Sequence, residues 1–142
     1  MNTAPIRLRV GAGGLLTVAA APTPPNCIHA PDSYYVHTYW LTCLGPTSTL
    51  AFERLASWVP ETGSAIQIDF DELAHNLGTA PARIARALER LAGFGLATID
   101  PDIPAMITIK TRAPNLHPRL LEKLAEGCPT LYACHPGTRI AS

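Results

Sequence analysis

The sequence predicts an α+β fold, a small domain in which two helices joined by a tight turn are followed by a β-hairpin. Residues 69–78 and 81–92 have the apolar spacing of two consecutive helices, with a glycine between them. Residues 96–99 and 105–110 are short apolar segments separated by a turn-forming DPDIP loop. With 142 residues and 47% hydrophobic content, the chain is long enough to bury one core.

The N-terminal part of the chain, residues 1–31, is expected to form a β-hairpin extension and a proline-rich linker. Apolar residues alternate with arginines over residues 6–10, a GAGG stretch supplies a turn, and residues 15–18 return as the second strand. Three prolines within residues 22–25 predict a stiff connection. The segment imitates a secretory signal peptide, but its apolar stretch contains three glycines, so we favour the hairpin and a cytoplasmic protein.

Residues 32–127 are expected to form the domain itself, beginning with an aromatic segment, a helix and a short strand. The aromatic segment 34–44 has the periodicity of neither a helix nor a strand; we expect it to pack in the core, with a dimer interface as the alternative. Gly45-Pro46-Thr47 opens a helix, and residues 66–68 supply a strand. The apolar face of the helix consists of Ala51, Phe52, Leu55, Trp58 and Val59.

The two consecutive helices have local end signals and, in the second, two chemically different faces. Asp69 can cap the first helix, Gly78 can end it, and Pro81 suits the first turn of the second, which runs to residue 92. At about 100° per residue, the second helix has an apolar arc and a cationic arc. The apolar arc is Ile84, Leu88 and Leu91; the cationic arc is Arg83, Arg86 and Arg90.

Three guanidinium groups on one arc have the chemistry that major-groove reading requires, because arginine pairs bidentately with guanine or with phosphate. The alternative is an exposed helix face that is only solvated, on which Glu89 pairs with one of the arginines.

The second helix is followed by the sequence GFGLA at residues 93–97, in which a glycine turns the chain into an edge strand. The resulting order is helix, strand, helix, helix, strand, wing and strand. Over about residues 45–112 this order resembles the winged helix-turn-helix family, and residues 40–55 are similar to small proteins of that fold from GC-rich bacteria with no assigned activity. The resemblance implies double-stranded DNA as the partner, a location on the nucleoid, and a homodimer that reads two half-sites.

The function predicted is that of a sequence-specific DNA-binding protein, a transcriptional regulator. The helix over residues 81–92 is expected to enter the major groove, and the wing to contact the DNA backbone. The predicted DNA-binding residues are Arg83, Arg86 and Arg90 on the helix, Thr79 at its start, and Lys110 and Arg112 near the wing.

The charge balance leaves alternatives open. Eleven basic and eleven acidic residues give zero net charge, whereas non-specific DNA affinity rests on an excess of Lys and Arg. Weak or strongly sequence-dependent binding is therefore expected. A neutral chain also suits a winged-helix module that docks a protein partner, and a replication or partition initiator is a further DNA-binding alternative.

The C-terminal part is expected to hold a short helix over residues 117–126, with Leu120, Leu121 and Leu124 on one side, and an irregular tail over residues 128–142. The four cysteines lack the spacing of a zinc site, so no metal is expected. The sequence has no catalytic motif, cofactor-binding loop or membrane-spanning run that we recognise. We therefore predict a protein that is not an enzyme, needs no cofactor and does not enter a membrane.

Overall fold

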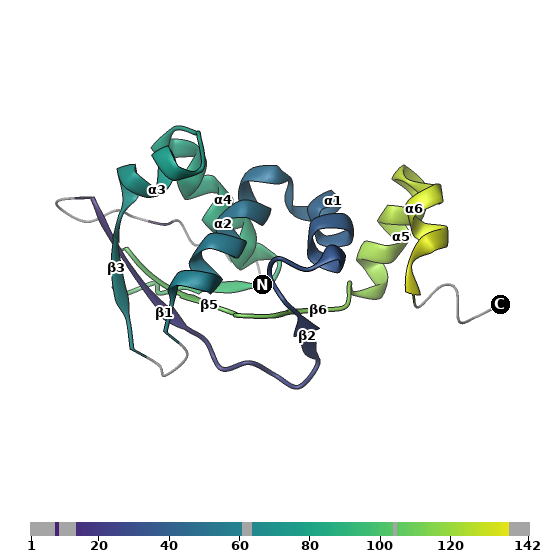
Figure 1. Ribbon diagram of the computed structural model, residues 1–142, viewed down its shortest axis with the longest axis horizontal. Helices are drawn as coiled ribbons and strands as arrows, with labels where there is room; N and C mark the ends of the chain where they lie inside the picture. Colours follow the sequence, from purple (N-terminus) through teal and green to yellow (C-terminus); the bar gives the residue numbers. More distant parts are fainter. Residues whose placement is uncertain (1–7, 9–13, 61–63, 104, 137–142) are drawn as a thin grey trace.

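Helices lie over one face of a four-stranded sheet in the computed structural model, which describes residues 8, 14–60, 64–103 and 105–136 (Figure 1). The strands are β1 (Leu15–Ala20), β3 (Ile66–Asp69), β4 (Ala97–Ile99) and β5 (Met106–Ile109), in the order β3-β1-β5-β4. β1 is antiparallel to β3 and parallel to β5, and β4 is antiparallel to β5. The expected α+β class is confirmed.

β1 lies inside the sheet and not in a separate extension. Residues 15–18 pair with β3 and residues 17–20 pair with β5, so the strand has a neighbour on each side. Leu16 and Val18 are fully buried, as alternate residues of a strand are when one face of the sheet is covered. The expectation of an N-terminal hairpin extension is therefore wrong for this strand. Its proposed partner, residues 6–10, lies outside the described residues apart from Leu8.

The aromatic segment is helical and forms part of the core. A wide π-type stretch, η1 (Val36–Trp40), continues into the short helix α1 (Leu41–Leu44). Tyr35, Tyr39 and Trp40 are buried, and Trp40 Nε1 donates a hydrogen bond to the Pro114 carbonyl at 2.8 Å. The expected core packing is confirmed for these three aromatic residues, whereas Tyr34 is 75% exposed and Thr42 is also exposed.

The next helix, α2 (Pro46–Trp58), begins where the sequence predicted. Ala51, Phe52 and Leu55 are fully buried. Trp58 was expected on the same face, but it is 41% exposed because it stands at the edge of the buried arc and at the last residue of the helix. Near the start of α2, the Ser48 hydroxyl donates to the Ala87 carbonyl at 3.1 Å, which ties α2 to the fourth helix.

The expected pair of consecutive helices is present as α3 (Phe70–Asn76) and α4 (Pro81–Gly93). The Asp69 side chain accepts hydrogen bonds from two backbone N–H groups in the first turn of α3. Gly78 has a φ of +68°, and the N–H groups of Gly78 and Thr79 donate to carbonyl oxygens in the last turn of α3. This is a Schellman motif, so short-range sequence signals determine the turn between the helices.

α4 ends in the same manner and leads into the predicted hairpin. Gly95 has a φ of +80°, and the N–H of Leu96 donates to the Leu91 carbonyl at 3.0 Å. β4 and β5 then pair with Ala97 opposite Ile109. The glycine exit and the two hairpin strands are confirmed.

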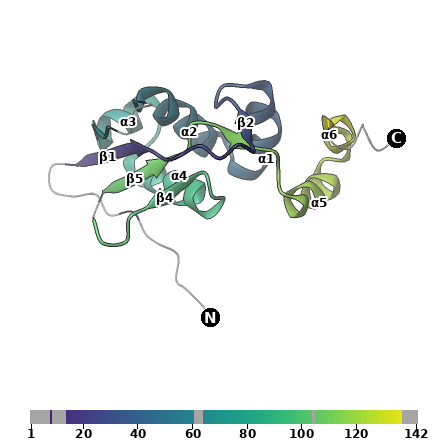
Figure 2. The same cartoon turned by 90° about the horizontal axis from the view of Figure 1, so that it is seen from below.

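A second small sheet joins an N-terminal strand to a C-terminal one, and two helices follow it. β2 (Cys27–His29) pairs with β6 (Ala113–Pro114), and α5 (Pro118–Gly127) and α6 (Pro129–Cys134) follow. The expected irregular tail is wrong over α6, because Pro129 occupies the first turn of a helix, where the missing N–H needs no partner. α5 and α6 pack on each other and extend beyond α1 at one end of the molecule (Figure 2).

Tyr35 joins segments from both halves of the chain. Its hydroxyl accepts a hydrogen bond from the Leu116 N–H at 2.9 Å and lies 2.7 Å from His135 Nε2. The His29 ring stacks on the Tyr35 ring, with centroids 3.8 Å apart. Burial raises the pKa of Tyr35 and lowers the pKa of His135, so the pair is uncharged near neutral pH.

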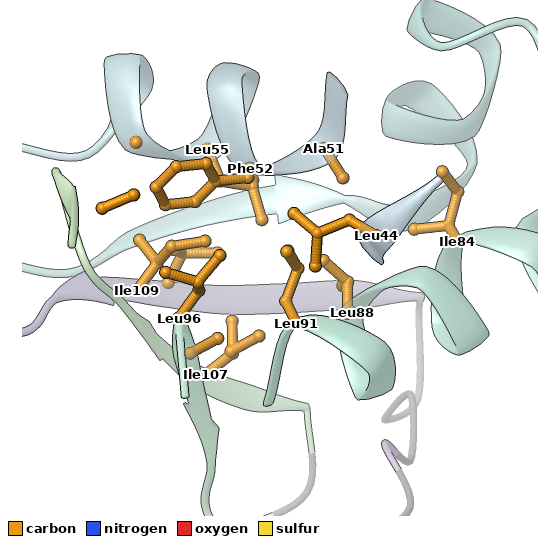
Figure 3. Close-up of a cluster of buried hydrophobic side chains, with 14 of the residues drawn as sticks. Leu44, Ala51, Phe52, Leu55, Ile84, Leu88, Leu91, Leu96, Ile107 and Ile109 are labelled. Carbon is orange, nitrogen blue, oxygen red and sulfur yellow. The ribbon is translucent and has the colours of Figure 1, made fainter. Parts of the chain in front are cut away.

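The core lies between the helices and the sheet (Figure 3). The apolar arc of α4 points into it as predicted, since Ile84, Leu88 and Leu91 are all fully buried. They meet Phe52 and Leu55 from α2 and the inward residues of the hairpin, Leu96, Ile107 and Ile109. The burial of one arc of α4 determines which of its other side chains face outward.

Candidate nucleic-acid interface

The outward arc of α4 presents the three predicted arginines. Arg83, Arg86 and Arg90 are exposed, and they follow one another at intervals of three and four residues along one side of the helix. Among the described residues, neither Arg83 nor Arg86 makes a hydrogen bond or ion pair with another part of the chain. Their guanidinium groups are therefore available to a ligand.

These arginines share a shallow groove with the start of α2. The groove has a volume of about 360 Å³ and is lined by the three arginines, Ala87 and residues 44–48; none of these lining residues is acidic. The N-cap of α2 is Gly45, which has no side chain to accept a hydrogen bond from the first turn. A helix start and cationic side chains therefore face the same space, and both attract an anion. We call this the arginine groove.

Arg90 differs from the other two arginines because it binds its own chain. Its Nε and Nη2 donate to the Cys43 carbonyl at 3.2 and 2.9 Å, and its guanidinium lies 6.0 Å from the centre of the Phe94 ring. Cys43 lies in the last turn of α1, where carbonyl oxygens lack helical partners. Arg90 thus caps α1, and three of its five N–H groups remain for another ligand.

The other flank of α4 meets the N-terminal segment. The Leu8 N–H donates to Glu89 Oε2 at 2.8 Å, and the Leu8 side chain is buried. Glu89 thus accepts a hydrogen bond from the backbone at Leu8. The outward surface of α4 consequently consists of a flank near Leu8 and the flank that carries the arginine groove.

The remaining predicted residues are not gathered with the arginines. Thr79 is half-buried in the turn before α4. Lys110 stands at the root of the hairpin, where its N–H donates to the Leu96 carbonyl at 3.0 Å. Arg112 lies 3.5 Å from the Ile28 carbonyl and lines a different groove, beside Ser57 near the end of α2. The arginine groove includes the first residues of α2, whereas the groove of Arg112 includes Glu53, Arg54 and Ser57 farther along the helix.

The loop of the hairpin is acidic rather than basic. The Asp100 side chain accepts hydrogen bonds from the N–H groups of Asp102 and Ile103 at 2.8 and 3.0 Å, which fixes the turn. Asp102 and Ile103 are exposed, and the described part of the loop, residues 100–103 and 105, has no cation. A loop of this composition repels phosphate groups and therefore does not fit the expected contact with a DNA backbone.

Sequence reasoning missed Lys123 of α5. This lysine lines a second cavity together with Arg90, Cys43 and Phe94. Burial raises the pKa of the Cys43 thiol, and the charges of Arg90 and Lys123 oppose that rise only in part. No local pattern in the sequence of α5 places Lys123 beside α4, because the contact depends on how α5 returns to the domain.

The described part of the chain offers no group of three or more His, Cys, Asp and Glu side chains that could hold a metal ion. His29 and His135 do approach each other, but both contact the Tyr35 ring. Over the same residues, none of the helices has the length and apolar character needed to span a bilayer. Comparison with protein-family models, with curated proteins and with solved structures finds no match to this chain.

Proposed function

We propose that this protein binds double-stranded DNA sequence-specifically as a winged helix-turn-helix transcriptional regulator, with α4 in the major groove. The observation that carries the proposal is the arginine groove, in which exposed Arg83 and Arg86 stand beside a helix start with no acidic residue in the lining. Arginine fits both the guanine edge and phosphate, so this surface has the chemistry of a DNA contact.

The order of elements supports the winged-helix assignment. α2, β3, α3, α4, β4 and β5 follow one another as the sequence resemblance implied. The chain departs from that expectation in one respect, because β1 stands between β3 and the hairpin strands and widens the sheet. This insertion leaves the outward arc of α4 unchanged, since the helices lie on one face of the sheet.

The structure suggests different roles for the arginines. Arg83 and Arg86 contact base edges or phosphates, and the start of α2 receives a phosphate of the same strand. Arg90 holds α1 against α4 and so positions the groove. Two copies reading two half-sites remain our expectation for the DNA complex.

The test is a double substitution, Arg83→Ala with Arg86→Ala, compared with Lys110→Ala and Arg112→Ala, which removes the same charge from other surfaces. A target duplex is first selected from a random library with the unmodified full chain, and affinities are then measured by fluorescence anisotropy over a range of salt concentrations. We expect the first variant to lose about a hundredfold in affinity, at about 1–3 kcal/mol per contact, with a shallower salt dependence. We expect a loss of less than about threefold in the second.

Equal losses in the two double variants would contradict the proposal, as would failure of the unmodified chain to select any sequence. The second outcome would favour the alternative, a module that docks a protein partner. The specific observation behind that alternative is the hairpin loop, which exposes Asp102 together with Ile103, a large apolar residue that is 55% exposed.

A further inference from the structure

A second cavity lies on the other side of Arg90, between the end of α1, the end of α4, and α5. Its volume is about 390 Å³, within the range of small-molecule sites. The walls include Phe94, Leu120 and Leu124, which are apolar, and Thr42. Two positively charged residues, Arg90 and Lys123, also line the cavity, and none of the lining residues is acidic.

The polar groups of this cavity favour an anion. Arg90 has three N–H groups left after its two bonds to the Cys43 carbonyl, and Lys123 of α5 adds an ammonium group to the lining. Thr42 donates its only hydroxyl proton to the Tyr39 carbonyl at 2.7 Å, so the charged donors left for an anion are Arg90 and Lys123. Burial keeps the Cys43 thiol protonated, so Cys43 brings no negative charge to the described lining of the cavity.

The apolar walls restrict the class of anion. An inorganic phosphate or sulfate would leave Phe94, Leu120 and Leu124 in contact with water, whereas a carboxylate with an apolar body covers them. We propose that this cavity binds a small organic monoanion, an aromatic or short aliphatic carboxylate, with its carboxylate between Arg90 and Lys123 and its body against Phe94 and the α5 leucines.

Binding at this site has a consequence for the arginine groove. Arg90 lines both cavities, so an anion held between Arg90 and Lys123 neutralises one of the three charges of the groove and fixes α5 against α4. This consequence, unlike the binding itself, rests on the proposed function. It predicts that the organic anion weakens DNA binding.

The test titrates the full chain with benzoate and hexanoate, and with their neutral counterparts benzamide and hexanamide, by NMR. We expect saturable shifts at the Phe94 and Leu124 signals with the carboxylates at millimolar concentration, and affinities at least about tenfold lower for the amides. Lys123→Met keeps the alkyl stem and removes the charge; it should weaken carboxylate binding about tenfold. Arg119→Met on the same helix does not line the cavity and should leave binding unchanged.

Three results would overturn the proposal: no saturable shifts with either carboxylate, equal affinity for carboxylates and amides, or equal effects of Lys123→Met and Arg119→Met. The last comparison is valid if both variants keep the far-ultraviolet circular dichroism of the parent. Anisotropy with the selected duplex, with and without benzoate, separates the two proposals. Carboxylate binding by a chain that selects no DNA would leave this site intact and remove the DNA-binding proposal alone.

Discussion

The grooves at the two ends of α2 differ in charge balance. At its start, the arginine groove contains three cations and no acid. Near its end, the groove that includes Arg112 contains two cations and two acids, and Arg54 in it donates to Glu53 at 2.9 Å. A chain with zero net charge can therefore hold one surface with a local excess of positive charge, because the acids lie elsewhere. Net charge is consequently a poor guide to the function of this protein.

The comparison assumes that the arginine arc of α4 can be changed without disturbing the core. The first test therefore compares a substitution in the buried arc of α4 with one in the outward arc. Leu88→Ala removes a fully buried side chain and should lower the free energy of unfolding by roughly 2–5 kcal/mol. Arg86→Ala should change it by less than about 0.5 kcal/mol, because the side chain is exposed and makes no hydrogen bond or ion pair among the described residues.

Urea unfolding, followed by circular dichroism, measures both variants. If Arg86→Ala destabilised the protein as much as Leu88→Ala, then the arginine groove would be a structural feature, and losses of DNA affinity would have to be attributed to unfolding.

A second variant reduces the charge difference between the two grooves. Thr47→Glu places a carboxylate in the arginine groove, in the first turn of α2, where the helix dipole favours it. Stability should be unchanged or slightly higher, while DNA affinity should fall about tenfold because the added charge opposes Arg83 and Arg86. Ser57→Glu adds the same charge beside Arg112 and is the matched control. An equal fall in affinity for both variants would mean that only net charge matters.

Local signals predicted the elements around the arginine groove well. Asp69, Gly78 and Pro81 fix the ends of α3 and α4 through contacts within a few residues, so their roles are legible in the sequence. β1 was misplaced because its pairing with β5 joins residues 89 positions apart, such as Thr17 and Met106. Hydrophobic alternation identifies a strand but not its neighbours.

The residues of the arginine groove and of the second cavity were predictable only in part, because local patterns do not show which residues distant in sequence lie together. The helical period placed Arg83 and Arg86 on the outward arc. The bond from Arg90 to the Cys43 carbonyl spans 47 residues, and the position of Lys123 depends on the path of α5, so no periodicity reveals either one. Lys110 and Arg112 were assigned by their closeness in sequence to the hairpin, but they follow β5 at its root, away from the loop.

The smallest expected effect concerns Tyr35, whose hydroxyl lies 2.7 Å from His135 at the end of α6. The Tyr35 hydroxyl accepts a hydrogen bond from the Leu116 N–H and lies 2.7 Å from His135 Nε2, to which it can donate its own proton when that nitrogen is unprotonated. Burial lowers the pKa of His135 in the folded protein below its ordinary value. The unfolded chain therefore binds a proton first as the pH falls, and stability should decline below about pH 6.5.

Tyr35→Phe removes the bond and should cost about 1 kcal/mol at pH 8. It should also leave a smaller difference in stability between pH 8 and pH 5.5, since protonation of His135 then breaks no hydrogen bond with Tyr35. Urea unfolding at the two pH values measures this, with Tyr34→Phe as the control because Tyr34 is 75% exposed. DNA affinity should be the same in both variants, because Tyr35 does not line the arginine groove. A loss of DNA affinity in Tyr35→Phe alone would show that the C-terminal helices and the arginine groove are coupled.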